Sequence, residues 1–461
     1  MLARCPATAR AVPFVWLVCA GCAFDALGLG STLDPSFGSM EGDSGVTSGT
    51  LEPTTAAASS VTTDTGGTGD TGDTGDTADT SEPCPDGCPP AIGWTVVADR
   101  AGYALALEPG GDVVVAGDRA QVDDELLRDV WLARFAGSDG QLRWEQRYNG
   151  AERRSDFARA VVALDDGRVV AGGGSQEVQG RRQDVWLGWY DADGMALKSG
   201  NLGTAKWDGD NVQLDESVRS LALGSSGELI AGGTRCQAPC VVPDAWLGRF
   251  DREGLAQWSE PMLVTGPGAL RAVTTLAGGL LGAGTDGYSE SKAPWRSQIR
   301  SFDASGAGSW SALQEPPGAT SFDALGVAVA PGGELWVVGR ELDGESVIGG
   351  FVRLYRPDRE FMPVVERRGE ALGGDANGVV IAADGGVVIT GTADPDGARH
   401  LWLGRFTGAL EPVWRIDEPA DAVDSGRALV QDGLGVIVLG QILGPDAIPV
   451  GTWLRRYLYQ V

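Results

Sequence analysis

The sequence predicts an all-β protein, a seven-bladed β-propeller of four-stranded blades, and three observations carry that prediction. A phrase of short strands and turns returns seven times at intervals of about 50 residues, a period typical of propeller blades. Each copy offers runs of small, β-branched or aromatic residues between glycine turns, as strands require. The last copy lacks a fourth strand, and a strand-like segment that could supply it precedes the first copy.

The repeat is marked by a glycine that we expect to end the second strand of each copy. Successive markers are separated by 49 to 60 residues. A turn glycine stands six residues before each of the first six markers, and Leu434 takes that place in the last copy. The markers are Gly117, Gly173, Gly233, Gly284, Gly339, Gly391 and Gly440.

The strands of the first copy are predicted from their residue types. Residues 103–107 and 113–116 are small or β-branched, as two buried strands of a hairpin should be. Residues 129–135 alternate large apolar with small or polar residues, which suits a third strand with unequal faces. A fourth strand follows a glycine turn and often carries tryptophan. The tryptophans at this place are Trp144, Trp258, Trp310 and Trp414.

The two ends of the repeat region complement each other. The seventh copy ends with a third strand at 453–457, whereas residues 92–97 form an additional strand before the first copy. Trp94 in that strand falls where Trp144 falls in a complete blade. We therefore expect the N-terminal strand to pair into the last blade, which closes the ring and removes two exposed edges. The propeller should span residues 91–461.

Residues 1–21 have the pattern of a signal peptide, with a basic start and a mostly apolar run over 11–20. Ten apolar residues are too few to cross a hydrocarbon core of ~30 Å. The sequence Ala20-Gly21-Cys22 resembles the cleavage box of bacterial lipoproteins, although Cys19 replaces the usual leucine-like residue. The resemblance implies acylation of Cys22, which would anchor the chain to a lipid bilayer at the outer membrane or cell surface. The alternative is an ordinary secreted protein.

Residues 22–90 should form a disordered tether that is acidic and rich in Thr, Gly and Asp. No Lys or Arg occurs between residues 23 and 83, and residues 68–77 repeat Thr-Gly-Asp. Such a composition cannot bury enough apolar surface to offset its conformational entropy. Weak calcium binding or O-glycosylation is the alternative to a plain spacer, but the tract lacks the bidentate glutamate of a calcium loop.

The formal net charge of -27 and the sequence pI near 4.4 limit the partners. Nucleic-acid binding requires a basic surface, so we expect no nucleic-acid partner. The same acidity opposes direct docking on anionic lipid surfaces. The remaining partners are an envelope protein or glycan, and the bilayer through the acyl anchor. We expect a monomer.

Four cysteines remain once the leader and Cys22 are set aside, and they form two close pairs. In an exported protein each pair is expected to form a small disulfide loop. One zinc ion bound by all four thiolates is the alternative, because both spacings suit it. The four residues are Cys84, Cys88, Cys236 and Cys240.

The residues needed for common catalytic sites are scarce. His400 is the one histidine of the chain, and we expect it to be an ordinary surface residue. General acid–base catalysis usually recruits histidine. We find no Ser-His-Asp set, metal-ligand cluster or phosphate-binding glycine loop. We therefore expect no enzyme activity, cofactor or metal, although an enzyme built on carboxylates alone stays open.

Candidate binding residues lie at the entrance to the innermost strands, beside the loops that join second to third strands. In three copies an acid precedes an arginine by three residues, and the fourth, fifth and sixth copies keep one of the two. Arginine–carboxylate pairs could join neighbouring blades. Alternatively, these groups could bind an anionic or sugar-like ligand at the channel mouth. They are Asp156, Arg159, Glu216, Arg219, Arg271, Asp323, Asp375, Asp424 and Arg427. Trp207 and Trp295 are further candidates for stacking on a sugar.

The repeat over 92–461 resembles the β-propeller repeats of bacterial surface proteins. Residues 251–258 and 303–310 are similar, more distantly, to quinoprotein repeats with their Asp, Gly and docking Trp, although the Asp-to-Gly gap is one residue short. No quinone ligands match, so that chemistry is not implied. The chain also resembles, in anchor and architecture, the non-enzymatic lipoprotein propeller of the outer-membrane assembly machinery.

We therefore expect a non-catalytic cell-envelope lipoprotein that binds a protein or glycan through its loop-rich face. One alternative is an envelope hydrolase or lyase that uses the carboxylates of Asp156, Asp323 and Asp375. Another is a structural partner in outer-membrane protein assembly. One fold hosts many functions, so the fold does not choose among them.

Overall fold

In the computed structural model, all the strands named below belong to one compact unit, Ala56–Leu443 with Pro449–Val461. Among the described residues, no helix is long and apolar enough to cross a membrane. The structure describes residues 88–120, 127–150, 154–176, 183–201, 214–224, 226–237, 243–258, 262–276, 279–286, 295–314, 320–344, 346–356, 362–394, 398–444 and 448–460.

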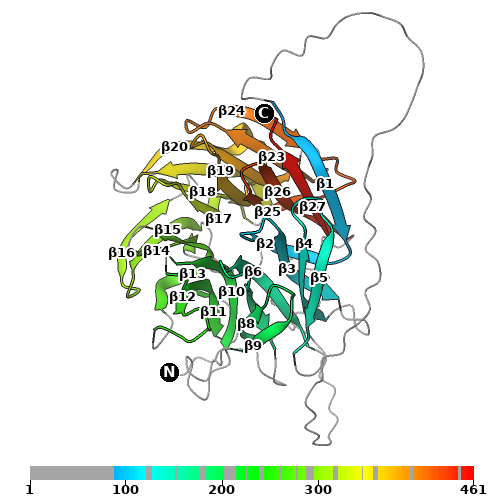
Figure 1. The fold of residues 1–461 in the computed structure, drawn as a ribbon. Coiled ribbons are helices and arrows are strands. Elements are labelled where there is room, and N and C mark those ends of the chain that lie inside the picture. The colour runs from blue at the N-terminus through cyan, green and yellow to red at the C-terminus, as the bar shows by residue number, and fades with distance from the viewer. Residues whose placement is uncertain are drawn as a thin grey trace, which may run out of the picture. The chain divides into compact units, whose positions relative to one another are not determined.

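The described strands form seven four-stranded blades around a central axis, as the sequence predicts (Figure 1). Within a blade the strands pair antiparallel in chain order from the axis outward. The innermost strands are β2, β6, β10, β13, β17, β21 and β25. Each contacts the next, and β25 contacts β2, so the ring is closed.

The first three blades occupy the N-terminal half of the propeller. The second strands of the first two blades begin with valines, which favour the extended backbone, and Val113, Val114 and Val115 are fully buried. The strands are β2 (Ala101–Leu107), β3 (Val113–Ala120), β4 (Arg128–Phe135), β5 (Leu142–Tyr148), β6 (Asp156–Ala163), β7 (Val169–Ser175), β8 (Asp184–Tyr190), β9 (Ala196–Asn201), β10 (Leu214–Leu223), β11 (Leu229–Gln237), β12 (Asp244–Phe250) and the first part of β13 (Met262–Leu276).

The remaining blades follow without a break in the pattern. A short 3-10 helix, η4 (Gly369–Ala371), lies between the fifth and sixth blades. The strands are the second part of β13, then β14 (Gly279–Asp286), β15 (Arg296–Asp303), β16 (Gly308–Gln314), β17 (Thr320–Val329), β18 (Leu335–Asp343), β19 (Ser346–Tyr355), β20 (Pro363–Arg368), β21 (Gly378–Ile381), β22 (Val387–Ala393), β23 (His400–Phe406), β24 (Pro412–Asp417), β25 (Ser425–Gln431), β26 (Gly435–Leu443) and β27 (Pro449–Leu458).

Strand β13 belongs to two blades, which the sequence did not indicate. Its first residues pair with β12 as the outermost strand of blade 3, and residues from Gly268 onward pair with β14 as the innermost strand of blade 4. The prediction that Trp258 lies in a fourth strand is therefore wrong. The chain makes an isolated bridge between Phe250 and Ala256, and it bends before β13 begins at Met262.

The N-terminal strand closes the ring as expected. Strand β1 (Ala91–Ala98) pairs antiparallel with β27 and completes blade 7, and Figure 1 shows the blue β1 beside the red β27. Trp94 lies opposite Arg456 in this pair. This pairing removes the edge that β27 would otherwise expose. The predicted leader 1–21, Cys22 and almost all of the predicted tether lie outside the described residues.

The core of the propeller consists of seven apolar clusters, one at each contact between neighbouring blades. The clusters include the tryptophans of the third strands, among which Trp131, Trp186 and Trp246 are at most 1% exposed. A sheet that is apolar on both faces must cover both faces with other elements, and here each blade packs against its two neighbours. The recurring tryptophans therefore serve to pack neighbouring blades together.

Indole groups also join neighbouring blades by hydrogen bonds. Trp94 Nε1 donates to the Gly137 carbonyl at 2.9 Å, and Trp144 Nε1 donates to the Ala192 carbonyl of the next blade at 3.1 Å. Both acceptors lie in turns between third and fourth strands. A Cβ added at Gly140 would lie 2.8 Å from the Trp94 ring. The turn glycines therefore make room for the docking tryptophan of the preceding blade.

Arginines at the ends of third strands reach the same turns. Arg134 donates to the Ala192 carbonyl at 2.7 Å, and Arg249 donates to the Ala304 carbonyl at 2.8 Å. Asp112, in the same blade as Arg134, accepts from Arg134 Nε at 3.1 Å. Arginine–carbonyl bonds thus join blades at the end opposite the predicted channel mouth, which the sequence analysis missed.

Candidate binding site at the propeller axis

A β-bulge positions the candidate arginines in the innermost strands. Ala158 pairs with Gly173 and Ala160 pairs with Gly172, so Arg159 lies between them without a paired residue on the second strand. Five other innermost strands show the same one-residue shift in register. A bulge redirects a side chain and often occurs beside functional sites.

The marker glycines lie opposite these bulges. An added Cβ at Gly173 would lie 1.8 Å from the carbonyl oxygen of Phe157, a distance that no side chain tolerates. The expectation that these glycines end the second strands is wrong, because the strands continue for two to four more residues. The glycines are required by the close approach of the bulged strand and not by a turn.

Seven bulge positions surround the axis, one from each blade. In blade 6 the bulge position falls just before β21, where the backbone N–H of Asn377 donates to the Thr390 carbonyl. At every position the bulge residue is partly exposed, whereas the residue before it is buried. Four positions carry arginine. The seven residues are Tyr103, Arg159, Arg219, Arg271, Leu325, Asn377 and Arg427.

The candidate acids fall into two classes, although the sequence analysis treated them as equivalent. Asp156, Glu216 and Asp424 precede the bulge position by three residues. Asp323 and Asp375 precede it by two residues. Because side chains alternate along a strand, this single step turns Asp323 and Asp375 toward the other face of the sheet.

The three acids of the first class contact either the segment just before their own innermost strand or the end of the second strand of their own blade. Asp156 is fully buried and accepts from the Gly150 amide at 2.7 Å, and burial raises the pKa of Asp156 to about 6. Glu216 is 2% exposed and pairs with Arg235 at 3.1 Å. Asp424 accepts from the Leu443 amide at 2.7 Å.

Asp323 joins two blades. Its carboxylate accepts from Arg271 Nε of blade 4 at 2.9 Å and from Arg340 of its own blade at 2.9 Å, and it also accepts from the Thr285 hydroxyl. Asp323 is fully buried. Burial acts to raise the pKa of Asp323, but the two guanidiniums outweigh it and hold that pKa below its ordinary value.

Arg159 forms the second inter-blade pair. Its guanidinium donates to Asp118 of blade 1 at 2.8 Å and lies 3.5 Å from the centre of the Tyr103 ring. Its side chain is 17% exposed. The structure therefore contains arginine–carboxylate contacts between blades of the kind the sequence suggested, and the pair of Arg271 and Asp323 joins two of the candidate residues. In the Arg159 pair, the acid comes instead from the second strand of the neighbouring blade.

Arg427 has a neutral hydrogen-bond partner. Its Nε donates to Gln441 Oε1 at 2.6 Å, and Gln441 Nε2 donates to the Gly102 carbonyl at 2.8 Å. Asp375 is 8% exposed, and burial raises its pKa. The Asn377 side-chain amide donates to Asp375 at 3.1 Å and to the Gly426 carbonyl of blade 7 at 2.8 Å, so polar side chains connect blades 6, 7 and 1 around the axis.

The second-strand members of this site were not predicted from the sequence, although a signal was present. The residue after each marker glycine is polar in six of the seven copies and glycine in the second. The structure brings several of these residues to the axis. They are Asp118, Thr285, Arg340, Thr392 and Gln441.

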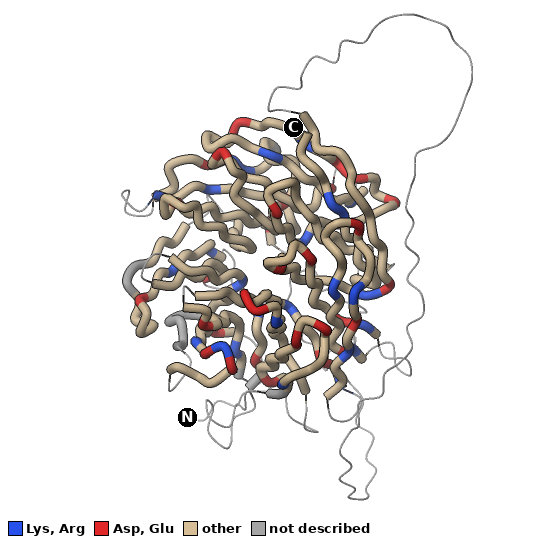
Figure 2. Tube along the Cα trace, viewed as in Figure 1, with Lys and Arg blue, Asp and Glu red and all other residues tan. Residues whose placement is uncertain are grey.

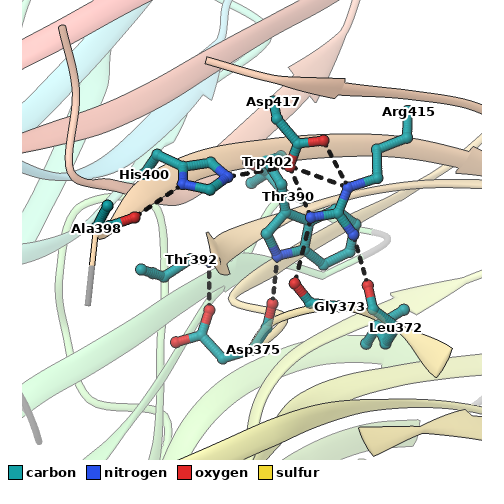
Figure 3. A network of polar contacts seen from close by, with 10 residues as sticks. All are labelled: Leu372, Gly373, Asp375, Thr390, Thr392, Ala398, His400, Trp402, Arg415 and Asp417. Atoms are coloured by element: carbon teal, nitrogen blue, oxygen red, sulfur yellow. Dashed lines mark hydrogen bonds and ion pairs between the residues drawn. The ribbon is translucent and has the colours of Figure 1, made fainter. Parts of the chain in front are cut away.

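His400 belongs to a polar network in blade 6 and is not the isolated surface residue expected from the sequence (Figure 3). Nδ1 lies 3.0 Å from the Ala398 carbonyl oxygen, and Nε2 lies 3.2 Å from Asp417 Oδ1. Arg415 binds the same carboxylate at 2.9 Å and also donates to the Leu372 carbonyl at 2.8 Å.

Other predicted features have different outcomes. Trp295 is 7% exposed, so the prediction that it stacks on a sugar is wrong, and Trp207 lies outside the described residues.

Cys84 and Cys240 lie outside the described residues, so the disulfide pairs with Cys88 and Cys236 stay predictions. Within the described ranges, no group of three or more His, Cys, Asp or Glu residues could hold a metal ion. Figure 2 shows acidic and basic residues interspersed on the blades.

Comparisons with known proteins find likeness in structure alone. No family model and no curated protein sequence matches the chain. A Dyadobacter fermentans protein of unknown function is 12% identical, with a TM-score of 0.45 over 78% of this chain and 95% of its own. The polysaccharide lyase Uly1 is 10% identical, with a TM-score of 0.49 over 78% of this chain and 90% of its own.

BamB from Moraxella catarrhalis is 13% identical to the chain. Its TM-score is 0.38 over 82% of this chain and 94% of its own. Sqt1 from Chaetomium thermophilum, bound to the N-terminus of a ribosomal protein, is 13% identical with a TM-score of 0.44 over 77% of this chain and 96% of its own. At these identities the likeness concerns the fold and not the function.

Proposed function

We propose that the chain is an exported, lipid-anchored, non-catalytic propeller that binds an envelope protein or glycan at the axis end where the innermost strands begin. The observation that carries this proposal is the set of seven partly exposed bulge positions, four of which carry arginine. A rigid ring of blades presents these side chains with little loss of conformational freedom on binding. The export signal and the acylation of Cys22 are part of the proposal and rest on the sequence alone.

The burial of the candidate carboxylates favours binding over catalysis. Asp156, Asp323 and Asp375 are 0%, 0% and 8% exposed. A general acid or base must come within hydrogen-bond distance of the substrate. These carboxylates instead contact backbone amides, guanidiniums or amide side chains of the propeller. The hydrolase or lyase alternative would therefore need other residues.

The experiment is an affinity capture from gently solubilised envelopes with the full mature protein as bait. The test variant replaces Arg159, Arg219, Arg271 and Arg427 by Ala. Its fold is checked by circular dichroism before use. We expect the wild type to retain a partner that the variant loses.

A second variant controls for the loss of four positive charges. It replaces four exposed residues on outer strands or loops, namely Arg143, Lys198, Arg356 and Arg368, by Ala. This variant should capture the same partner as the wild type. Equal capture by all three proteins, or loss in both variants, would contradict the axial site. Altered outer-membrane protein levels in a deletion strain would instead support a role in assembly.

A further inference from the structure

Polar side chains of blade 1 gather on the face of its sheet that packs against blade 7. Arg119 of β3 lies directly opposite Asp129 of β4, and Arg147 of β5 donates to the Asp129 carboxylate. Opposite residues of antiparallel strands point to the same face, with Cβ atoms about 5 Å apart. Trp131, two residues after Asp129, belongs to the apolar cluster between blades 7 and 1, which identifies this face.

Arg100 reaches the same place from the segment before β2. The antiparallel register of β2 and β3 places Arg100 beside Arg119. Arg100 Nε also lies 3.5 Å from Glu145 Oε1, and Glu145 stands two residues before Arg147 on β5. Strand register and ion pairs therefore bring three guanidinium groups together at one end of blade 1.

The two nearest acids are bound by other donors. Asp129 is fully buried and binds the Arg147 guanidinium. Glu145 accepts from Trp131 Nε1 at 2.8 Å and also contacts Arg100. Both carboxylates are therefore engaged without a bond to Arg119.

Arg119 makes no hydrogen bond or ion pair with any residue that the structure describes. Burial lowers the pKa of the Arg119 guanidinium most, and the positive charges of Arg100 and Arg147 lower that pKa further. Glu145 and Asp129 act in the opposite direction but do not outweigh these effects. Arg119 therefore lies among like charges without a bound carboxylate.

An anionic group beside Arg119 would relieve this repulsion. A charge that is partly removed from water is costly unless an opposite charge pairs with it. Asp99 binds Arg100 nearby, but the Asp99 side chain is 88% exposed, so water screens its charge. Because Arg119 is partly exposed, an incoming group can reach its N–H donors.

We propose that Arg119, with Arg100 and Arg147, binds a carboxylate group of an acidic polypeptide segment at this end of blade 1. A guanidinium presents a planar set of N–H donors that matches the two oxygens of a carboxylate. The side chains of Arg100 and Arg147 are 18% and 38% exposed, so they can contribute to the same site. The site uses none of the axial bulge residues and so goes beyond the proposed function.

The neighbouring side chains favour a carboxylate on a polypeptide. The charges of Glu145 and Asp129 repel a doubly charged phosphate or sulfate more strongly than a singly charged carboxylate. Trp131 is 1% exposed, so its ring offers no surface for stacking on an acidic sugar.

The test measures fluorescence anisotropy of a labelled hexaglutamate peptide with the full mature protein, and a hexaglutamine peptide is the neutral control. We expect the wild type to bind hexaglutamate and not hexaglutamine. Arg119→Ala should bind about tenfold more weakly, as expected for the loss of a hydrogen bond between charged groups. Arg356→Ala removes one exposed arginine of blade 5 and should bind as the wild type does.

Equal binding of the two peptides, or equal affinity of the wild type and Arg119→Ala, would overturn the proposal. Trigalacturonate that binds more tightly than hexaglutamate would overturn the choice of a polypeptide ligand. Arg119→Lys keeps the charge but not the planar fork, so it should recover only part of the affinity.

Urea unfolding distinguishes this binding role from a structural one. Because Arg119 bonds none of the described residues and is repelled by its neighbours, Arg119→Ala should unfold at a urea concentration no lower than the wild type does. A clear shift to lower urea would give Arg119 a structural role and overturn the proposal.

Phenylglyoxal labelling, read by mass spectrometry, locates the contact. Arg119 should be labelled in the free protein and protected by hexaglutamate but not by hexaglutamine. Labelling of Arg119 that bound hexaglutamate leaves unchanged would contradict the site.

The axial arginines provide the last comparison. Hexaglutamate binding that Arg119→Ala keeps and Arg159→Ala/Arg427→Ala loses would place the carboxylate site at the axis and overturn this proposal. Envelope capture that Arg119→Ala leaves unchanged, together with lost hexaglutamate binding, would support two separate sites.

Discussion

Removing the carboxylate of Asp323 should destabilise the propeller strongly. The side chain is fully buried and accepts from Arg271 at 2.9 Å and from Arg340 at 2.9 Å. Asp323→Ala leaves both guanidiniums without this partner, in a site where the Arg271 and Arg340 side chains are only 10% and 6% exposed. Breaking a buried ion pair from one side costs about 3–5 kcal/mol, so we expect the free energy of unfolding to fall by that amount.

Urea unfolding of the full mature chain, followed by tryptophan fluorescence and by circular dichroism, measures this loss. Coincident transitions would validate a single free energy for a protein of this size. The exposed pair of Asp166 and Arg168 provides the control, with side chains 39% and 24% exposed. Asp166→Ala should cost less than about 1 kcal/mol.

The pH dependence gives a second check on the same variant. The pKa of Asp323 is lowered from 3.8 in the folded state, so its stabilising effect is present above pH 4 and is lost as the pH falls through the folded pKa. The difference between wild type and Asp323→Ala should therefore shrink in acid. A loss under about 1 kcal/mol at pH 7, or a difference that grows in acid, would refute the reasoning.

Three further predictions concern other parts of the chain. Burial raises the pKa of Asp156 from 3.8 to about 6, so between these values the native state holds a proton that the unfolded state releases. The free energy of unfolding should therefore fall by about 3 kcal/mol as the pH rises from 4 to 6. In urea titrations, Asp156→Asn should flatten this dependence of the free energy of unfolding on pH. An unchanged dependence would mean that other groups cause it. Gly173→Ala should cost at least about 1–3 kcal/mol because its Cβ would strike the Phe157 carbonyl, whereas Gly110→Ala, with open space around it, should change stability by less than about 0.5 kcal/mol. Cys22→Ser should abolish membrane association and acyl labelling, and an anchored variant would exclude lipidation at that residue.

The repeat pattern was enough to predict the architecture because each blade repeats the same local requirements. Strand runs and glycine turns recur along the propeller and five of the seven third strands carry tryptophan, so an error in one copy leaves the count of blades unchanged. The closing strand was predictable for the same reason. Trp94 occupies the position of Trp144, and the strand it marks pairs with β27.

The partners of the site residues were not predictable from that pattern. Arg159 and Asp156 stand three residues apart in the sequence, but Arg159 pairs with Asp118 of the neighbouring blade. A bulge separates the two residues and turns their side chains apart. Nothing in the spacing of one copy specifies which side chain of the neighbouring blade lies beside its arginine.

The sequence by itself determined the number of blades, their strand order and the strand that closes the ring, because these depend on short-range periodicity. The tertiary structure decided which polar groups meet at the axis, because that depends on strand register. A one-residue difference in register separates Asp323 from Asp156 and turns them toward opposite faces. The bulged strands pack closely against the marker glycines, as the Phe157 carbonyl does against Gly173, and this packing fixes the register. The register in turn brings arginines from four blades to one axis.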